Sequence, residues 1–536
     1  MKTYRIVLGL AFLVMYYSCM ANDDNSVNPK AIPAKANIVK HPVVIGNSET
    51  DVINIEINTS STKVLVNVNL IFDSVSSLSN VASIKLFSVG SFQTSSRREL
   101  VALSDKISLK PDLKGNRSLV SGINNFSIAI TPSAKADITG TLLVKSVILN
   151  YLDKTSEKID FVPSAGVIRF AYLLRAAGED NCNTYRIPGL ATTNKGTLIA
   201  VYDNRYNNSS DIQGHIDVGM SRSTDGGRTW SPMKVIMDMG EWGGKPQAEN
   251  GIGDPCVLVD KNTNTIWVAA LWLNGYGGKM AWNASRPGLT PEVTGQFMLV
   301  KSEDDGITWS EPINITEQIK KPEWYLIFQG PGNGITMKDG TLVFPAQFKG
   351  ANQVPHSTVI SSIDGGKTWK IGTSAKSNTT EAQVVQLNDG KLMLNMRDDR
   401  NRTEKGDNNG RAVAVTSDLG QTWTVHPSSN GALPEPNCMA SLISTNVNIA
   451  GKPTQVLLFS NPNNKVSRSN MTIKASLDGG LTWPVENQLE LNADEGFGYS
   501  CMTMIDDSNV GIVYEGVKCL YYQIIPLKEI IKGVKF

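Results

Sequence analysis

The sequence predicts an all-β protein in which a six-bladed β-propeller follows a small β-sandwich. An octapeptide of the form Ser/Thr-x-Asp-x-Gly-x-Thr-Trp occurs five times, centred on Asp225, Asp304, Asp364, Asp418 and Asp478. The copies follow one another at intervals of 79, 60, 54 and 60 residues, a spacing typical of propellers and other repeat folds. Before the first copy, apolar and polar residues alternate over short runs, which predicts antiparallel strands outside the repeat.

The octapeptide has the composition of a turn between two strands. Its Ser or Thr and its Asp can bond nearby backbone amides, its Gly accepts a positive φ, and its Trp can pack the hairpin inward. It resembles the Asp box of sialidases and several other propellers, and we use that name for it. Because the same turn recurs from unit to unit, we expect its aspartates to be structural rather than catalytic.

A second turn signal recurs between the Asp boxes. Lys195-Gly196, Asp339-Gly340 and Asp389-Gly390 each precede Thr-Leu or Lys-Leu, which predicts hairpins with two-residue loops. Four-stranded units follow from this pattern. Residues 165–536 are long enough for close to six units of about 60 residues, so we expect the six-bladed β-propeller there.

The region before the propeller divides into two parts. Residues 22–40 are polar and lack periodicity, which predicts a tether. Residues 41–160 contain alternating runs, for example 52–57 and 63–70, which predict an antiparallel β-sandwich. The chain therefore has a small accessory domain in front of the propeller.

Composition excludes several classes of function. With 536 residues, 41% of them hydrophobic and 19% charged, the chain is globular and large enough for two or more cores. A net charge of +1 and the lack of a dense Lys/Arg cluster argue against nucleic acid as a partner. The four His residues have no zinc-ligand spacing, so we expect no metal site. The five Cys residues after Cys19 lack tight spacing and are expected to be buried free thiols.

Residues 1–21 have the pattern of an export signal. Lys2 and Arg5 precede a ten-residue apolar run, and small residues follow it. The run is too short to span a bilayer, so we expect no transmembrane segment. Two processing outcomes remain open: cleavage after Ala21 would release a soluble protein, whereas Cys19 could carry the lipid of a bacterial lipoprotein. We expect an exported protein that is periplasmic, an outer-membrane lipoprotein or secreted.

Three arginines outside the Asp boxes lie in comparable settings, although each alone would be interpreted as a surface salt-bridge residue. Arg186, in Thr-Tyr-Arg-Ile-Pro, is followed by apolar residues, as expected on an inner strand near the propeller axis. Arg397 follows an apolar run and Arg468 lies in Val-Ser-Arg-Ser. Guanidinium groups that met without an anion would repel one another, and each offers paired N–H donors that suit a carboxylate.

Tyr-Arg-Ile-Pro, the Asp boxes and the two later arginines resemble the bacterial exo-α-sialidase (neuraminidase) family, as found in Bacteroides-like bacteria. The resemblance covers residues 165–536. It implies that Arg186, Arg397 and Arg468 clamp the carboxylate of sialic acid. It also implies that Glu515 orients the first of these arginines.

The same resemblance implies a tyrosine nucleophile. Tyr499 matches the nucleophile of the family, and Glu381 matches its base. The anomeric carbon of sialic acid bears a carboxylate that would repel an anionic nucleophile but not a neutral phenol. A phenol with a pKa of about 10 needs a base beside it at neutral pH.

The acid/base residue is expected in the loop after Asp203-Asn-Arg205. Asp203, Asp211 and Asp217 are candidates, and the loop position of the family selects Asp211. It would protonate the leaving oxygen and then accept a proton from water, with retention of configuration. By the same resemblance, Arg205 and Asp254 match positions that bind the ring substituents.

Accessory domains often precede the propeller in similar exported sialidases and often bind carbohydrate. Residues 41–160 contain no Trp, because every Trp of the chain lies between Trp230 and Trp483. Sugar platforms usually need aromatic side chains. Glycan binding and a spacer or packing role therefore both remain open for this domain.

These residues together predict a retaining exo-α-sialidase, a glycoside hydrolase that needs no cofactor. We expect sialylated glycans as its partners, and a monomer. A trans-sialidase would share every residue named above, with an acceptor platform that could include Trp242, Trp272, Tyr276 and Trp282. A non-catalytic glycan-binding propeller is the alternative from another class, and the matched nucleophile, base and arginines argue against it.

Overall fold

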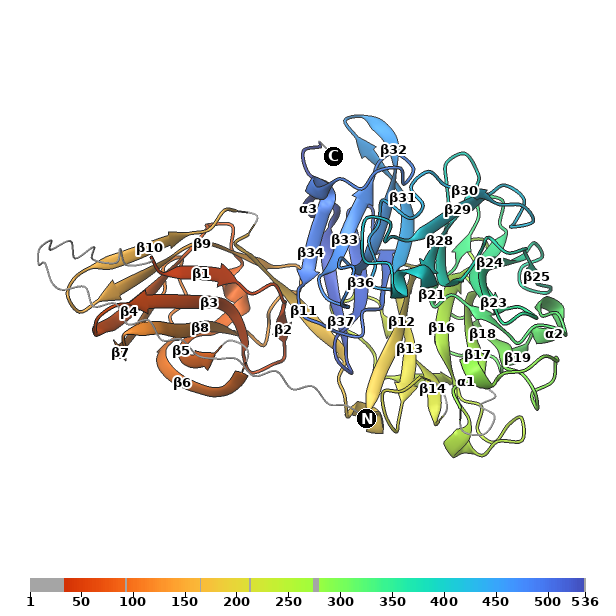
Figure 1. Ribbon diagram of the computed structural model, residues 1–536, viewed down its shortest axis with the longest axis horizontal. Helices are drawn as coiled ribbons and strands as arrows, with labels where there is room; N and C mark the ends of the chain where they lie inside the picture. The colour runs from red at the N-terminus through yellow and green to blue at the C-terminus, as the bar shows by residue number, and fades with distance from the viewer. Residues whose placement is uncertain (1–32, 92–93, 164, 212–213, 273–278, 535–536) are drawn as a thin grey trace, which may run out of the picture.

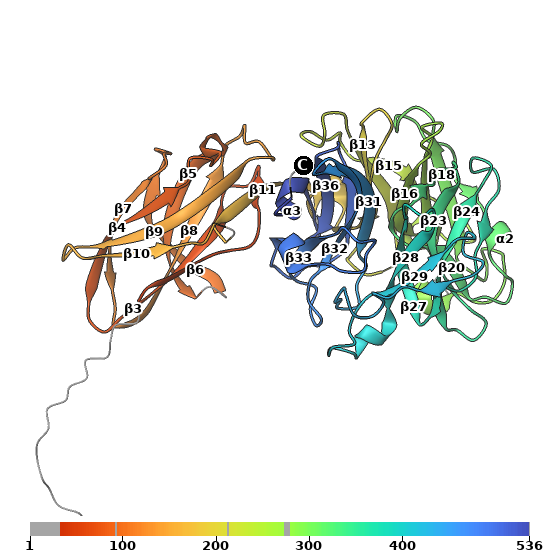
Figure 2. The same ribbon diagram turned by 90° about the horizontal axis from the view of Figure 1, so that it is seen from above.

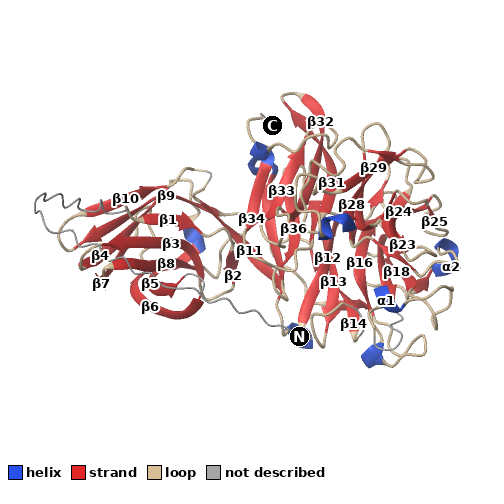
Figure 3. Cartoon of the chain, in the orientation of Figure 1, coloured by secondary structure: helices blue, strands red, loops and turns tan. Residues whose placement is uncertain are grey.

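The protein is all-β, as predicted. Its computed structural model describes residues 33–534 except 92–93, 164, 212–213 and 273–278. The described residues form seven β-sheets with a few short helices (Figure 3). The sheets gather in a smaller N-terminal body and a larger C-terminal body (Figures 1 and 2). None of the described helices is long and apolar enough to cross a membrane, and the predicted export signal lies outside the described residues.

Two sheets form the N-terminal body and enclose one apolar core. The first has the strand order β1-β3-β8-β5-β6, and the second contains β11-β9-β4-β7 with β10 beside β9. Ile55, Val68 and Phe126 are buried in the core between them. The strands are β1 (Lys35–Ile38), β2 (Val43–Ile45), β3 (Thr50–Thr59), β4 (Lys63–Phe72), β5 (Val81–Ser91), β6 (Thr94–Ser104), β7 (Asp112–Leu119), β8 (Gly122–Pro132), β9 (Thr141–Tyr151), β10 (Ser156–Asp160) and β11 (Val167–Arg175).

The N-terminal body begins earlier than the sequence predicted. Residues 22–40 were expected to be a tether, but β1 pairs antiparallel with β3 within that range. Ala36 and Ile38 face the apolar core, and their burial stabilises this short strand in the sheet. The alternation over so few residues was too weak to predict it.

Strand β11 belongs to both bodies. Its first residues pair with β9, Phe170–Tyr172 pairs in parallel with β2, and its end pairs antiparallel with β37. One sheet of the N-terminal body therefore continues into the sheet β35-β36-β37. Figure 1 shows β2 and β11 at the junction of the two bodies.

The described C-terminal residues form six sheets, of which the last includes β11. Their orders are β12-β13-β14-β15, β19-β18-β17-β16-β21, β20-β23-β24-β25, β27-β28-β29-β30, β31-β32-β33-β34 and β35-β36-β37-β11. Inner strands of neighbouring sheets contact one another: β12 contacts β16, β16 contacts β22, β22 contacts β27, β27 contacts β31, β31 contacts β35, and β35 contacts β12. Separate apolar cores fill the space between neighbouring sheets.

The bounds of the C-terminal elements are β12 (Thr184–Thr192), β13 (Leu198–Arg205), β14 (Ile216–Ser223), β15 (Lys234–Met237), β16 (Ile252–Val259), β17 (Ile266–Trp272), α1 (Ala281–Ala284), β18 (Gln296–Ser302), β19 (Ile313–Asn314), α2 (Thr316–Ile319), β20 (Leu326–Gln329), β21 (Gly332–Asn333), β22 (Ile335–Thr336), β23 (Leu342–Lys349) and β24 (Pro355–Ser362). They continue with β25 (Lys370–Ile371), β26 (Lys376–Ser377), β27 (Thr379–Gln386), β28 (Leu392–Asp398), β29 (Ala412–Thr416), β30 (Thr424–Val425), β31 (Ser441–Ile449), β32 (Lys452–Pro462), β33 (Met471–Ser476), β34 (Gln488–Asn492), β35 (Ser500–Met504), β36 (Asn509–Glu515), β37 (Leu520–Pro526) and α3 (Leu527–Ile530).

All five Asp boxes adopt the same hydrogen-bonded turn. In the third, Ser362 Oγ donates to Asp364 and accepts the Gly366 N–H, while the Asp364 carboxylate accepts the N–H and the hydroxyl of Thr368. The same pattern of contacts surrounds Asp225, Asp304, Asp418 and Asp478. Each carboxylate is therefore used to shape its own turn.

The hairpin loops are longer than the two-residue loops that were predicted. Thr193 N–H donates to the Thr197 carbonyl, and Gly196 N–H donates to the Thr193 carbonyl, which gives a three-residue loop. The two equivalent loops have the same hydrogen bonds, over residues 337–341 and 387–391. A two-residue type I′ loop needs a positive φ at both central residues, but only the glycine of each predicted pair has one.

The Asp boxes give the fold a defined sensitivity to acid. Hydrogen bonds from Thr368 and Ser362 lower the pKa of Asp364 to about 2. A carboxylate with a lowered folded-state pKa stabilises the fold above its ordinary pKa of about 3.9, and this stabilisation is lost as the pH falls through about 2. We expect Asp364→Asn to lower the Tm at neutral pH, and the Tm difference from the parent to shrink between about pH 4 and pH 2.

Scanning calorimetry of the two proteins across this pH range measures the difference. The matched control is Asp507→Asn, which alters an exposed aspartate outside the boxes. Equal losses in both variants, or a difference that stays constant with pH, would contradict the assigned role of the box carboxylate.

Candidate active site

A cavity of about 330 Å³ collects residues from several sheets of the C-terminal body. Five of the predicted site residues line it: Asp211, Asp254, Glu381, Arg397 and Tyr499. They are supplied by β16, β27, β28, the loop between β13 and β14, and the segment just before β35. Residues far apart in the sequence thus share one chemical environment.

Tyr499, Glu381 and Arg397 form a buried cluster. The Tyr499 hydroxyl donates to Glu381 Oε1. Arg397 Nη1 donates to Glu381 Oε2 at 2.6 Å and to the Tyr499 hydroxyl oxygen at 3.1 Å. Burial and then the charge of Glu381 raise the pKa of Tyr499 well above its usual value. The phenol is therefore protonated and bonded to a carboxylate that can receive its proton.

Glu515 ties Arg186 to the backbone of Tyr499. Its Oε1 accepts Arg186 Nε at 3.1 Å and the N–H of Ile187 at 2.8 Å, while its Oε2 accepts the N–H of Tyr499 at 2.9 Å. Glu515 is buried, so its charge is neutralised by these donors rather than by water. Arg186 Nη1 donates to Asp211 Oδ1 at 3.0 Å.

Arg468 completes a group of three cations around the phenol. Its Nη1 donates to the Phe497 carbonyl at 2.8 Å. Its guanidinium carbon lies 5.7 Å from the centre of the Tyr499 ring, and that of Arg186 lies 5.3 Å away. With Arg397 on the hydroxyl, three arginines converge on one side chain, an arrangement suited to binding an anion.

Asp211 occupies the mouth of this group. Its Oδ1 accepts from Arg186 and, at 2.8 Å, from Arg205 Nη1, although its side chain is 65% exposed. Burial alone would raise the pKa of Asp211, but the charges of Arg205 and Arg186 outweigh it and hold the pKa below its usual value. The structure thus places Asp211 beside Arg186 and Arg205.

Asp203 and Asp254 lie beneath Arg205. Asp203, buried within β13, accepts Arg205 Nε and Nη2 at 3.1 and 2.8 Å and the N–H of Asp254 at 2.8 Å. Burial and then the charge of Asp203 raise the pKa of Asp254 well above its usual value. Asp217 accepts the Tyr206 hydroxyl at 2.9 Å instead and is not among the described residues that line the cavity.

Three of the site residues lie at β-bulges in inner strands. The pairing register shifts after Arg186 in β12, around Asp254 in β16 and around Glu381 in β27. Ile187 and Asp254 have φ of 55° and 57°, a left-handed conformation that disfavours β-branched side chains such as Ile187. The bond from the Ile187 N–H to Glu515 helps hold this strained position. Bulges re-aim side chains out of the regular alternation of a strand, which suits a site at strand ends.

Apolar side chains line much of the remaining cavity wall: Ile187, Leu271, Met280, Ala281, Leu326 and Phe328. Of the four aromatic residues considered for an acceptor platform, Trp282 lines the cavity. Trp272 is fully buried and packs edge-on against Trp242, so it offers no face to an acceptor. Tyr276 lies outside the described residues.

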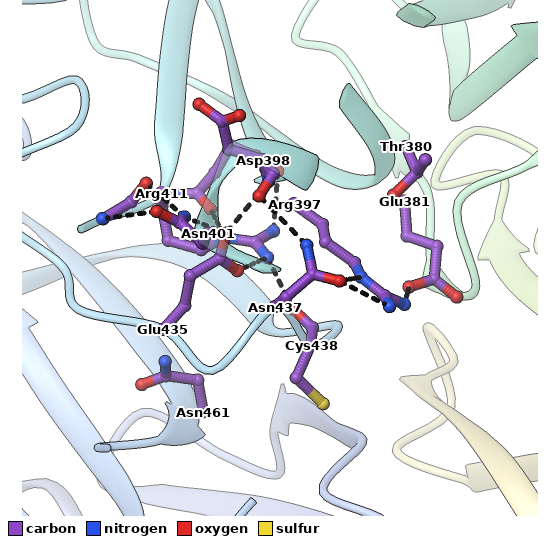
Figure 4. A network of polar contacts seen from close by, with 12 residues as sticks. Thr380, Glu381, Arg397, Asp398, Asn401, Arg411, Glu435, Asn437, Cys438 and Asn461 are labelled. Atoms are coloured by element: carbon purple, nitrogen blue, oxygen red, sulfur yellow. Dashed lines mark hydrogen bonds and ion pairs between the residues drawn. The ribbon is translucent and has the colours of Figure 1, made fainter. Parts of the chain in front are cut away.

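A polar network behind Arg397 was missed by the sequence analysis (Figure 4). Asn437 Oδ1 accepts Arg397 Nε and Nη2 at 3.3 and 3.0 Å, and the Asn437 carbonyl accepts Arg468 Nη2 at 3.4 Å. A fully buried ion pair of 2.7 Å between Arg411 Nη1 and Glu435 Oε2 holds the same segment. The one available signal was that Glu435 lies between two prolines in a chain segment with no strand pattern.

Two families of known domains match this chain. The BNR repeat-like domain matches residues 196–512. The N-terminal domain of BNR-repeat neuraminidases matches residues 31–154. The first match covers more than half of the chain and contains all five Asp boxes.

Individual relatives agree with these matches. A sialidase from Bacteroides fragilis is 51% identical over 424 residues, which are 78% of this chain and 76% of the relative. A sialidase from Micromonospora viridifaciens is 31% identical over 64% of this chain and 51% of its own length. The solved structure of a Hadza microbial sialidase superimposes with a TM-score of 0.83 and 41% identity, over 92% of this chain and all of that one. The chain therefore belongs to the BNR-repeat sialidase (neuraminidase) family, as its motifs predicted.

Proposed function

We propose that this exo-α-sialidase hydrolyses terminal sialic acid from glycoproteins, glycolipids and oligosaccharides with retention, through a covalent sialyl-tyrosine. The observation that carries the mechanism is the Tyr499–Glu381–Arg397 cluster in a cavity where two further arginines converge. The roles of the individual residues below follow from these contacts and from the motif matches.

In this mechanism Tyr499 attacks the anomeric carbon. The raised pKa of Tyr499 keeps the phenol neutral until the reaction, so it approaches the carboxylate-bearing carbon without charge repulsion. Glu381 accepts the phenolic proton as the new carbon–oxygen bond forms. Arg397, which touches both groups, stabilises the charge as it moves from Glu381 to the phenolic oxygen.

The substrate carboxylate would bind Arg186, Arg397 and Arg468. The guanidinium groups contact Asp211, Glu381 and the Phe497 carbonyl. Glu515 and Asn437 hold two of them from behind and leave donors for an anion. An arriving carboxylate would therefore find the arginines already oriented.

Binding of the anion would also prepare Asp211 as the general acid. Arg205 and Arg186 hold the pKa of Asp211 low, which disfavours the protonated form that an acid needs. A substrate carboxylate on Arg186 would compete for the Nη1 donor and add a negative charge nearby. Both effects raise the pKa of Asp211, so the acid form would be populated when substrate is present.

Arg205, Asp254 and the apolar wall would receive the ring substituents. Arg205 and Asp254 are fixed together through Asp203, which limits their freedom before the ligand arrives. Leu326, Phe328 and the other apolar side chains of the wall suit the methyl group of an N-acetyl substituent.

We further propose that the six C-terminal sheets are the blades of a six-bladed β-propeller, over residues 165–536, and that the two N-terminal sheets, from β1 onward, form its β-sandwich accessory domain. The serial contacts of inner strands, ending with β35 against β12, support the first assignment. The two sheets around one core support the second. An exported monomer, released after Ala21 or anchored through Cys19, completes the proposal.

Replacement of Tyr499 tests the nucleophile. We expect Tyr499→Phe to lower turnover of a 4-methylumbelliferyl α-sialoside by about 100-fold or more, because the phenolic oxygen that forms the covalent bond is gone. Tyr172→Phe, which removes a hydroxyl from β11 outside the cavity, is the matched control and should keep parental turnover. Full activity in Tyr499→Phe would defeat the covalent mechanism.

Replacement of Asp211 tests the general acid. We expect Asp211→Asn to lower turnover of a natural sialyl-lactose by about 100-fold or more, and that of the aryl sialoside far less, because an aryl leaving group departs without protonation. The control is Asp217→Asn, which should keep the leaving-group preference of the parent. An equal loss on both substrates in Asp211→Asn would assign the residue to binding instead.

Product analysis tests hydrolysis and stereochemistry together. Proton NMR during turnover is expected to show α-sialic acid first and the β-anomer only after mutarotation, because two displacements at one carbon retain configuration. Initial release of the β-anomer would exclude the covalent route. A 2,7-anhydro sugar or a sialylated acceptor as the main product would replace hydrolysis by a transferase reaction.

A further inference from the structure

The loop that carries Tyr499 is held at three places. We call residues 493–499 the Tyr499 loop. At its end Glu515 accepts the Tyr499 N–H. In its middle the Gly496 N–H donates to the Arg468 carbonyl and the Phe497 N–H donates to the Gly516 carbonyl, each at 3.1 Å. These two attachments belong to the C-terminal body itself.

The third attachment comes from the N-terminal body. At the start of the Tyr499 loop, the Ala493 N–H donates to the Lys40 carbonyl, which lies just before β2. Beside it, His41 Nδ1 lies 3.3 Å from Asp494 Oδ2. Two consecutive residues of the N-terminal body thus contact two consecutive residues of the Tyr499 loop.

The geometry around His41 requires a positively charged ring. Its Nδ1 faces the Asp494 carboxylate, and its Nε2 lies 2.5 Å from the Asp51 carbonyl oxygen. Both partners can only accept, so both ring nitrogens must carry a proton to satisfy them. Loss of one proton would break one of the two contacts.

The segment that carries His41 is connected to the C-terminal body through β2 and β11. β2 pairs with β11, which itself pairs with β37. Lys40 Nζ donates to the Ala165 carbonyl, and Arg169 donates to Glu529 of α3. These contacts fix the segment that carries His41, so His41 can hold the Tyr499 loop in place.

We propose that His41 is a positioning residue for Tyr499, and that through Asp494 the N-terminal domain holds the Tyr499 loop in its reactive geometry. The inference rests on the proposed role of Tyr499 as nucleophile. It gives the N-terminal domain a catalytic contribution that requires no sugar site of its own. Tyr499 and Phe497, whose carbonyl accepts from Arg468, both lie on this loop, so a shift at its start would reach the reacting atoms.

The contact between His41 and Asp494 depends on pH. Burial lowers the pKa of His41, but the bond and charge of Asp494 and the carbonyl and charge of Asp51 outweigh it, and the pKa is raised. Arg98, which pairs with Asp51, is the nearby cation on the N-terminal side. A raised pKa means that the contact is complete below the ordinary value of about 6.5 and is lost as the pH rises through the folded-state value.

The test compares His41→Gln and Asp494→Asn with the parent, as full chains, on the aryl sialoside. We expect kcat at about pH 5.5 to fall roughly threefold to tenfold in each variant. The change in KM should be smaller, because two of the three arginines of the clamp, Arg186 and Arg397, are held by Glu515 and Asn437 outside the Tyr499 loop. The ratio of parental to variant kcat should fall towards one as the pH rises through the folded-state pKa of His41, because the parental contact is then lost as well. The double variant should be no slower than the slower single variant.

Arg169→Gln is the matched control, since it removes another contact between the two bodies without touching the Tyr499 loop. Its kcat ratio to the parent should not vary with pH. An equal, pH-independent loss in Arg169→Gln and His41→Gln would overturn the inference, and so would parental kcat in Asp494→Asn, whose exposed side chain can change without unfolding the chain. Parental activity in His41→Gln and Asp494→Asn, together with an inactive Tyr499→Phe, would reject the inference and leave the proposed function standing. An active Tyr499→Phe would reject the proposed function itself.

Discussion

Charge compensation around Tyr499 is the constraint on which the rest of the site depends. Buried cations persist only where acceptors surround them, and the arginines near this phenol are each held by an acceptor contributed by another strand or loop. Glu515 is the most constrained of these acceptors, because it neutralises Arg186 and also fixes two backbone amides. The site therefore needs several sheets at once, and no single sheet could hold it.

The C-terminal body separates its repeated features from its unique ones. The Asp boxes repeat at exposed turns, where each carboxylate bonds within its own loop. The inner strands instead carry irregularities, and register shifts mark the positions of Arg186, Asp254 and Glu381. The repeated Asp-box turns stabilise the sheets, whereas the irregular ends of the inner strands position the side chains of the site.

Much of the fold could be predicted because its signals are local. Each Asp box predicts its turn from eight consecutive residues, and Tyr185-Arg186-Ile187 is recognisable as a motif. The three-residue hairpin loops were missed because a Lys-Gly or Asp-Gly pair suits two loop types, and only the φ of the first residue distinguishes them. Asn437 and His41 were missed for another reason. Arg397, the partner of Asn437, is 40 residues away in the sequence, and Asp494, the partner of His41, is 453 residues away. No local sequence pattern predicts either contact.

Strand β11 has a consequence for how this chain can be shortened. It is the outer neighbour of β37 and also part of the sheet that covers the N-terminal core. A chain that began after β11 would leave the backbone N–H and C=O groups of β37 without partners along an exposed edge. Such an edge pairs readily with other strands and promotes aggregation. The boundary between the two bodies is therefore a poor place to truncate the chain, because β11 pairs with an edge strand of each body.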